Sequence, residues 1–172
     1  KALLQNSRIF REAVGQVDTL FEPLAGFSLV AELSGDNGTD RFDQTEIAQP
    51  ALFALQIGIT ELLRAHHIEP SAVTGHSVGE VAAAYYSGAL SLEDAVHVIY
   101  YRSRYQGQTA GFGEMSAVGM NEQDIRALLE QEKCSGVEVA GINSAKGITL
   151  AGNPEQLSQL EAIFAENGTF YR

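Results

Sequence analysis

The stretch Ser71–Glu80 constrains the fold of this chain more than any other, because a β-prone run meets an alanine-rich helical run there. Between them, Gly75-His76-Ser77-Val78-Gly79 forms a G-x-S-x-G pattern, which is typical of a serine on a sharp strand-to-helix turn. Its glycines allow torsion angles and close approaches that a Cβ would prevent. The following helix directs free N–H groups toward an oxyanion near Ser77. We therefore expect Ser77 to form a covalent acyl-enzyme, although a serine at this place is most often a helix N-cap.

The composition is that of a globular domain with an acidic surface. The chain has 172 residues, of which 45% are hydrophobic and 19% are charged, so a real core can form. Eleven Lys and Arg stand against 22 Asp and Glu, which gives a net charge of −11 and argues against nucleic acid as a partner. An anionic substrate would then need a locally placed cation, which makes each interior arginine a candidate.

Neither a membrane span nor a secretion signal is recognisable, and we expect a cytoplasmic location. The apolar runs are broken well before bilayer-spanning length, and the first residues lack the apolar core of a signal peptide. The single cysteine, Cys134, cannot form an internal disulfide, which fits a reducing compartment. It stands in a polar run with no histidine nearby, so we expect a bystander thiol. We expect no metal site and no tightly bound cofactor.

The first half of the chain indicates mainly helices around one short strand. The expected elements are a helix over Leu3–Leu20 that Pro23 and Gly26 end, a helical turn or two over Phe27–Leu33, an exposed loop over Ser34–Asp40, a helix over Ala51–Leu63 with Pro50 in its first turn, a strand over Ala72–Thr74, a helix over Val78–Tyr86 and a helix from Ser91 through Arg104. The helix after Pro50 is apolar on nearly every side, which predicts burial between layers. This order favours an α/β architecture.

The pattern of predicted elements changes after Gly113, where we place a boundary between a region 1–113 and a region 114–172. The second region predicts strands over Met115–Gly119, Val137–Ala140 and Gly147–Ala151, helices over Asn121–Gln131 and Pro154–Ala165, and a last strand that begins at Thr169. Its order β-α-β-β-α-β matches the ferredoxin-like unit.

The residues around the elbow resemble the acyltransferase domain of polyketide and fatty-acid synthases, a family that includes malonyl-CoA:acyl-carrier-protein transacylases. The resemblance rests on Gly75–Glu80, Ala82–Ala84 and Ser87–Ala95, and extends to Gln49–Phe53, Tyr101–Arg104, Gly113–Met115 and Val139–Asn143. It therefore covers essentially the whole chain in the right order. The fold that it implies is an α/β-hydrolase-like subdomain with an inserted ferredoxin-like subdomain.

The resemblance also implies a ping-pong reaction. Ser77 would take an acyl group, typically malonyl, from the substrate coenzyme A thioester and pass it to the phosphopantetheine of an acyl carrier protein. The backbone N–H of Val78, the residue after the nucleophile, would be one oxyanion donor. Val78 is apolar where methylmalonyl-selecting relatives often carry Gln, which favours malonyl. Neighbouring domains of a multidomain synthase would be further partners.

Three more residues become binding candidates through the same resemblance. Arg102 would pair with the free carboxylate of the acyl group, and a planar guanidinium suits that bidentate contact. For Arg104 we expect only a cation near a helix end. His76 would line the acyl pocket; it is not expected to be the base, because adjacent residues on a sharp elbow point apart. Gln49 matches a position near the pocket, although a plain helix-start role is equally good.

Two parts of the family pattern are absent. The G-Q-G-type motif, whose Gln helps to form the oxyanion hole, would lie before Lys1, and the catalytic histidine would lie after Arg172. The chain also lacks an initial Met, so we expect an interior fragment that is weakly active or inactive alone. Two alternatives stay open: a serine esterase or thioesterase that uses the same elbow, and a non-catalytic binding module.

Overall fold

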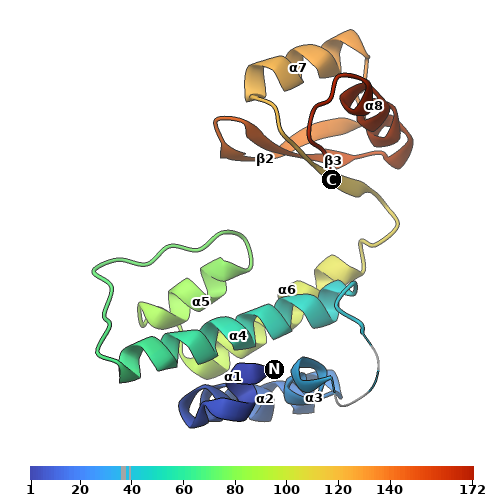
Figure 1. Cartoon of the computed structure of the whole chain (residues 1–172). Helices are drawn as coiled ribbons and strands as arrows, with labels where there is room; N and C mark the ends of the chain where they lie inside the picture. The colour runs from blue at the N-terminus through green and yellow to red at the C-terminus, as the bar shows by residue number, and fades with distance from the viewer. Residues whose placement is uncertain (36–37, 39) are drawn as a thin grey trace. The chain divides into compact units, whose positions relative to one another are not determined.

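A computed structural model describes residues 1–35, 38 and 40–172 of the chain (Figure 1). Contacts within the chain divide it into two compact units, Lys1–Gln108 and Thr109–Arg172. The first unit holds α1 (Ala2–Asn6), α2 (Arg8–Ala25), α3 (Leu29–Ser34), α4 (Thr45–Ala65), α5 (Gly79–Tyr86) and α6 (Leu92–Gly107). The second unit holds β1 (Glu114–Val118), α7 (Glu122–Gln131), β2 (Val137–Ser144), β3 (Gly147–Gly152) and α8 (Pro154–Glu166). The boundary drawn from the sequence, at Gly113, lies a few residues further on and stays a prediction.

The N-terminal helical pattern divides into two helices, and Gly26, but not Pro23, ends it as the sequence predicts. Ser7 is extended and accepts a hydrogen bond from the Phe10 N–H, so α1 ends there and α2 begins. Pro23 lies inside α2, which continues to Ala25 and ends at Gly26 with φ of 77°. The expected break at Pro23 is therefore wrong. Proline lacks the N–H that would bond to the carbonyl four residues earlier, and burial of the apolar face of α2, including Phe21, outweighs that loss.

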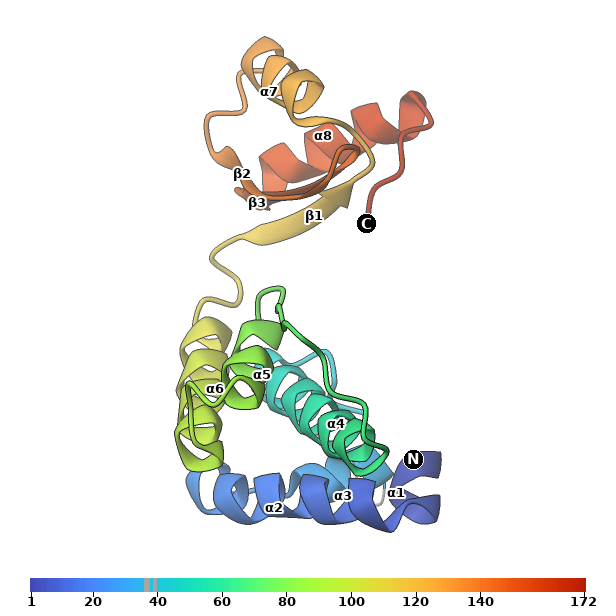
Figure 2. The ribbon, with the colours of Figure 1, turned by 90° about the vertical axis from the view of Figure 1, so that its left-hand side faces the viewer.

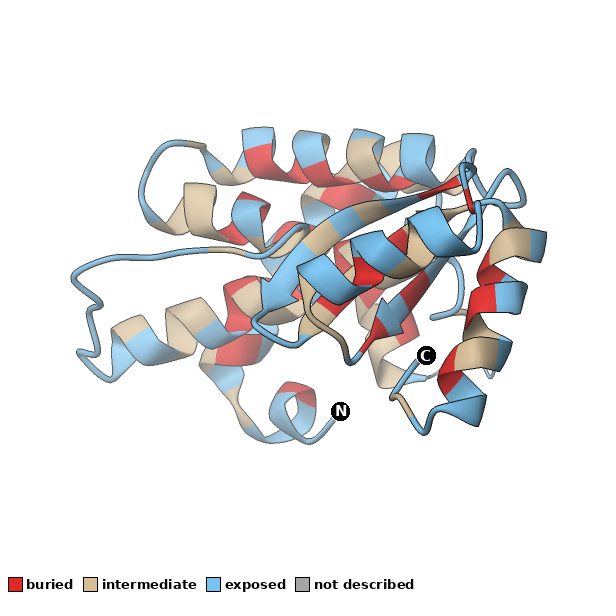
Figure 3. Ribbon diagram, turned by 90° about the horizontal axis from the view of Figure 1, so that it is seen from above, coloured by how far each residue is buried: buried red, intermediate tan, exposed pale blue. Residues whose placement is uncertain are grey.

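The central helix of the first unit is α4, which packs against α2, α3, α5 and α6. Its inner face buries Phe53, Ala54 and Ile57. Two expectations for this helix are corrected. It begins at Thr45, so Pro50 lies beyond the first turn, and Leu52, Ile59 and Leu63 are exposed, so the helix is not buried on all sides. Figure 3 shows the same pattern of one buried and one exposed side on most of the helices.

The strand expected at Ala72–Thr74 is not formed, and this is the main correction in the first unit. These residues lie in an exposed, irregular segment between α4 and α5 (Figure 1). Every strand of the described sheet belongs to the second unit. A strand is stable only when its backbone groups pair with a neighbour, and in the described part of the first unit this segment has no strand beside it.

The second unit confirms the ferredoxin-like arrangement. Its strands lie in the order β1-β3-β2 and are antiparallel. On the other edge of β1, Tyr171 forms an antiparallel bridge with Val118, and Ala117 and Arg172 exchange backbone hydrogen bonds of 2.8 and 2.9 Å. The last strand expected from Thr169 is thus a short bridged segment. Both α7 and α8 cover one face of the sheet (Figure 2).

Side-chain caps begin both helices of the second unit. Asn121 and Asn153 cap α7 and α8 through side-chain oxygens that accept from Asp124 N and Gln156 N. The core between sheet and helices contains Ile125, Leu150, Leu157, Leu160 and Phe164. In the expected loop Ser34–Asp40, positions 36, 37 and 39 lie outside the described residues, and Gly38 and Asp40 are exposed. No helix among the described residues is long and apolar enough to span a bilayer; the cytoplasmic location stays a prediction.

Candidate active site

The turn that carries Ser77 has the strained backbone expected of a nucleophile elbow. Ser77 has φ of 54°, in the left-handed region that residues other than glycine rarely adopt. The turn is closed by hydrogen bonds of 3.0 Å from Gly79 N to His76 O and from Glu80 N to Ser77 O. Helix α5 starts at Gly79, with Val78 in the N-cap position and without a side-chain cap. Ser77 therefore does not serve as the N-cap, and its exposed hydroxyl is available for other contacts.

The two glycines of the motif allow the backbone to close on itself. A Cβ at Gly75 would lie 2.3 Å from Glu80 N and from Gly79 O, so this position requires glycine. A Cβ at Gly79 would lie 3.4 Å from Gln56 Nε2, which shows how closely α4 approaches the start of α5. The elbow is thus fixed both by its own turn and by the helix packed against it.

Arg102 contacts the candidate nucleophile directly. Its Nη2 donates to Ser77 Oγ at 2.9 Å, and its Nη1 donates to Gln49 Oε1. The guanidinium is half-buried on α6, Gln49 lies on α4, and Ser77 lies on the elbow before α5. Arg102 therefore contacts two other residues singled out from the sequence, Ser77 and Gln49, which are 25 and 53 positions away in the chain.

Two glutamines that the sequence analysis did not name belong to the same region. Gln49 Nε2 donates to Gln106 Oε1 at 2.8 Å. Gln56 approaches the elbow from α4, and its Oε1 is buried without a hydrogen-bond partner among the described residues. Helical spacing could have indicated both, because Gln106 follows Arg102 by one turn and Gln56 follows Gln49 by two.

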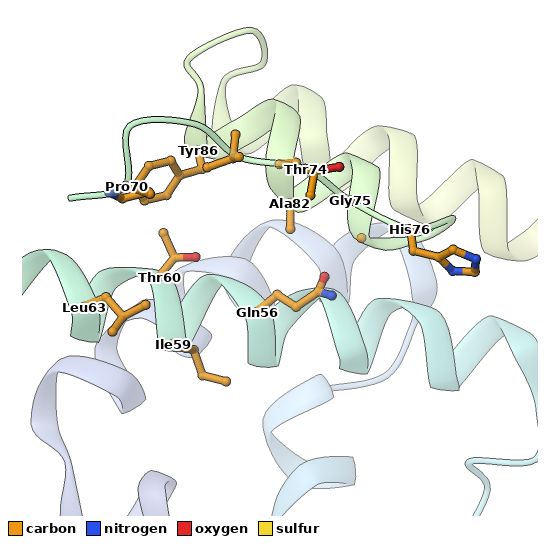
Figure 4. A pocket seen from close by; sticks show the side chains of 13 residues that line it. Gln56, Ile59, Thr60, Leu63, Pro70, Thr74, Gly75, His76, Ala82 and Tyr86 are labelled. Carbon is orange, nitrogen blue, oxygen red and sulfur yellow. The ribbon is translucent and has the colours of Figure 1, made fainter. Parts of the chain in front are cut away.

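A cavity of about 410 Å³ lies beside the elbow. Its wall is mostly aliphatic and aromatic, and includes Ile59, Leu63, Val73 and Tyr86, together with His76. In Figure 4 the ring of His76 lies at one end and is directed away from the aliphatic side chains. His76 thus lines a cavity, although its role in binding stays a prediction.

Arg104 lies two residues after Arg102 and has different contacts. Its Nη1 donates to Tyr100 Oη at 2.6 Å, and its guanidinium lies 5.9 Å from the centre of the Tyr100 ring. This hydrogen bond raises the pKa of Arg104. The side chain is exposed. Of the two arginines in the Tyr101–Arg104 motif, Arg102 is the one bonded to the candidate nucleophile.

Other candidate reactive groups have contacts of a different kind. Cys134 is buried in the core of the second unit, and burial raises the pKa of its thiol, which disfavours the reactive thiolate. His97 contacts the Glu93 carbonyl within α6 at 3.0 Å. Among residues 1–35, 38 and 40–172, no three His, Cys, Asp or Glu side chains are grouped so that they could hold a metal ion.

Comparison with known proteins identifies the class to which this elbow belongs. The chain is a member of the acyl transferase domain family, whose model matches residues 1–172. It is 35% identical over 98% of its length to probable polyketide synthase 45 of Dictyostelium discoideum. It is also 36% identical over its whole length to the reducing polyketide synthase AFT16-1 of Alternaria alternata.

The fold is the α/β fold of solved acyltransferase domains. A loading acyltransferase from the avermectin modular polyketide synthase superposes with a TM-score of 0.92, at 31% identity over 99% of this chain. The chain spans 6% and 7% of the two synthases named above, and 54% of the avermectin acyltransferase chain.

Proposed function

We propose that Ser77 accepts a malonyl-type acyl group from coenzyme A and passes it to the phosphopantetheine thiol of an acyl carrier protein, in polyketide or fatty-acid biosynthesis. The observation that carries this proposal is the hydrogen bond of 2.9 Å between Arg102 Nη2 and Ser77 Oγ. A cation thus lies beside the hydroxyl that would carry the acyl group, which supports the proposal. The carrier protein and the neighbouring domains of a longer synthase would be the partners, and coenzyme A thioester would be a substrate rather than a bound cofactor.

The geometry of the elbow suits both half-reactions. Ser77 Oγ attacks the thioester carbonyl, the tetrahedral intermediate collapses, the C–S bond breaks, and the coenzyme A thiolate leaves and takes up a proton. The carrier thiol then attacks the ester on Ser77 and restores the hydroxyl. The N–H of Val78 stands at the start of α5, where backbone donors have no acceptor within the helix, so it can bind the oxyanion in each step.

Arg102 is suited to bind a carboxylate and unsuited to be the base. A guanidinium donates hydrogen bonds and does not accept protons at physiological pH, so its contact with Ser77 Oγ leaves the hydroxyl proton for another group. When a malonyl carboxylate enters, the same N–H groups can form a bidentate pair with it. As the resemblance predicts, the base and the second oxyanion donor would come from outside residues 1–172.

A serine esterase or thioesterase is the second candidate, and the mainly apolar cavity beside His76 is the observation that favours it. The two functions differ in the acceptor of the acyl group: a thiol in one case and water in the other. They also differ in the role of Arg102, because an uncharged acyl chain has no carboxylate for the guanidinium to bind.

The test is to incubate the full-length protein with malonyl-CoA and to measure the mass of the peptide that contains Ser77. We expect a malonyl adduct that disappears when carrier protein bearing phosphopantetheine is added, with the acyl group recovered on the carrier. An adduct that is released only to water would favour the esterase. The absence of any adduct would refute acyl transfer through Ser77. The polypeptide of residues 1–172 alone, tested in parallel, is expected to show weak turnover or none.

A further inference from the structure

A hydrogen-bonded series of side chains leads away from Ser77 and includes Gln106, a residue that the acyl-transfer proposal does not use. Arg102 donates to Ser77 Oγ and to Gln49 Oε1, and Gln49 Nε2 in turn donates to Gln106 Oε1 at 2.8 Å. Gln106 and Arg102 lie one turn apart on α6, so their side chains share a face of that helix. Gln49, on α4, connects the two.

The direction of the Gln49 amide follows from its neighbours. A guanidinium has only donors, so the oxygen of Gln49 must face Arg102. The Gln49 nitrogen then faces Gln106, whose side-chain oxygen accepts from it. Without an acceptor at position 106, the amide could turn over and present its NH2 group to the guanidinium. Two donors would then face each other, and Arg102 would lose its support.

The anchor of Arg102 is also neutral, and this matters for binding an anion. In the part of the chain that the structure describes, the arginines paired with glutamates are Arg8, Arg41, Arg64 and Arg126. Arg102 is held by the oxygens of an amide and a hydroxyl instead. No described carboxylate forms an ion pair with it, in a chain with a net charge of −11. A carboxylate at position 49 or 106 would weaken its attraction for a substrate carboxylate.

We propose that Gln106 is a positioning residue that acts through Gln49. It keeps the Arg102 guanidinium directed at the acyl group on Ser77 and held by neutral oxygens. Gln106 thereby sets the preference for acyl groups that carry a free carboxylate over uncharged ones. This inference rests on the proposed acyl transfer through Ser77.

Two substitutions in the full-length protein test this role. Gln106→Leu removes the acceptor, whereas Gln106→Glu keeps the acceptor and adds a negative charge. For each variant, kcat/KM for acylation of Ser77 is measured with malonyl-CoA and with acetyl-CoA. Loss of one net hydrogen bond is expected to lower the malonyl value about three- to tenfold, mainly through KM, for Gln106→Leu. Gln106→Glu should lower the malonyl value as well, and acetyl values should change little in both.

The matched control is Gln108→Leu, since Gln108 is exposed at the C-cap of the same helix. It should leave both substrates unaffected. A merely structural role for Gln106 would lower kcat/KM for malonyl-CoA and for acetyl-CoA together. A malonyl-to-acetyl ratio of kcat/KM that stays unchanged in both variants would overturn the proposal. If Gln106→Leu does not fold, Gln106→Glu decides the question. Failure of the unaltered protein to acylate Ser77 from either thioester would instead contradict the acyl-transfer proposal.

Discussion

A β-prone stretch forms a strand in the second unit of the chain, whereas a β-prone stretch in the first unit does not. In the second unit, Gly147–Gly152 is the central strand, paired with β1 on one edge and with β2 on the other. In the first unit, Ala72–Thr74 stays exposed and outside any described sheet. Strand propensity is a preference for a pleated, half-buried surface, and it takes effect only where neighbouring strands supply that surface.

Among the described residues, a turn and helix packing set the local geometry of the candidate site. Ser77 is held by a tight turn and by the packing of α4, and its hydroxyl is bonded to Arg102. The second unit instead buries its own core between one sheet face and two helices. The two core clusters share no residue. Substitutions in one unit should therefore change acyl transfer or sheet stability without changing the other.

The largest effect is expected for Ser77→Ala, which removes the proposed nucleophile from the first unit. Acyl transfer by the full-length protein should fall by roughly 10⁴-fold or more, and the adduct on the elbow peptide should be lost. Rates of carrier-protein loading and peptide mass measure this. Ser135→Ala, at an exposed serine of the second unit, is the control and should be silent. Transfer that survives Ser77→Ala would mean that the elbow is not the site of acylation.

The next largest effect is expected for Leu150→Ala, which empties a fully buried position in the core of the second unit. It should lower the free energy of unfolding of that unit by about 2–5 kcal/mol. Hydrogen exchange measured by mass spectrometry should show lost protection in β1, β2 and β3, with the first unit protected as before. Phe53→Ala should instead reduce protection in the first unit and leave the second unit protected. Equal loss across both units would show that the chain unfolds as a single cooperative body.

Gly75→Ala should damage the elbow without emptying a core. The added Cβ would meet backbone atoms of Gly79 and Glu80 at 2.3 Å, so the turn must open. Displacement of a reacting group by about 1 Å costs on the order of 10²-fold in rate, and we expect a loss of Ser77 acylation of that size. A loss of that size in the acylation rate, together with near-normal hydrogen-exchange protection in the second unit, would support this prediction. A fully active Gly75→Ala variant would show that the tight turn is dispensable.

The smallest effect is expected for Gly15→Ala, and it should be stabilising. Gly15 lies inside α2, and a Cβ added there meets nothing within 4 Å. Replacing a glycine in a helix interior with alanine should raise the free energy of unfolding by about 0.5–1 kcal/mol. Thermal or urea unfolding of the first unit measures it. A destabilised variant would mean that α2 has contacts at this position beyond those of the described residues.

Short-range features were determined by the sequence alone, because the atoms that decide them lie within a few residues. The Ser91 hydroxyl accepts from Asp94 N at 3.0 Å, at the start of the helix that the sequence predicts from Ser91. The β-α-β-β-α-β order of the second unit is confirmed. The G-x-S-x-G spacing likewise predicts the tight turn at Ser77, whose positive φ follows from that turn.

The tertiary structure decided what depends on distant partners. Pro23 and Pro50 lie inside helices because burial of the apolar faces outweighs one missing N–H, and Ala72–Thr74 lacks a strand because no described strand lies beside it. The contacts around Arg102 join residues up to 57 positions apart. Helical spacing could place Gln106 on the face of Arg102, but only the packing of α4 against α6 brings Gln49 between them.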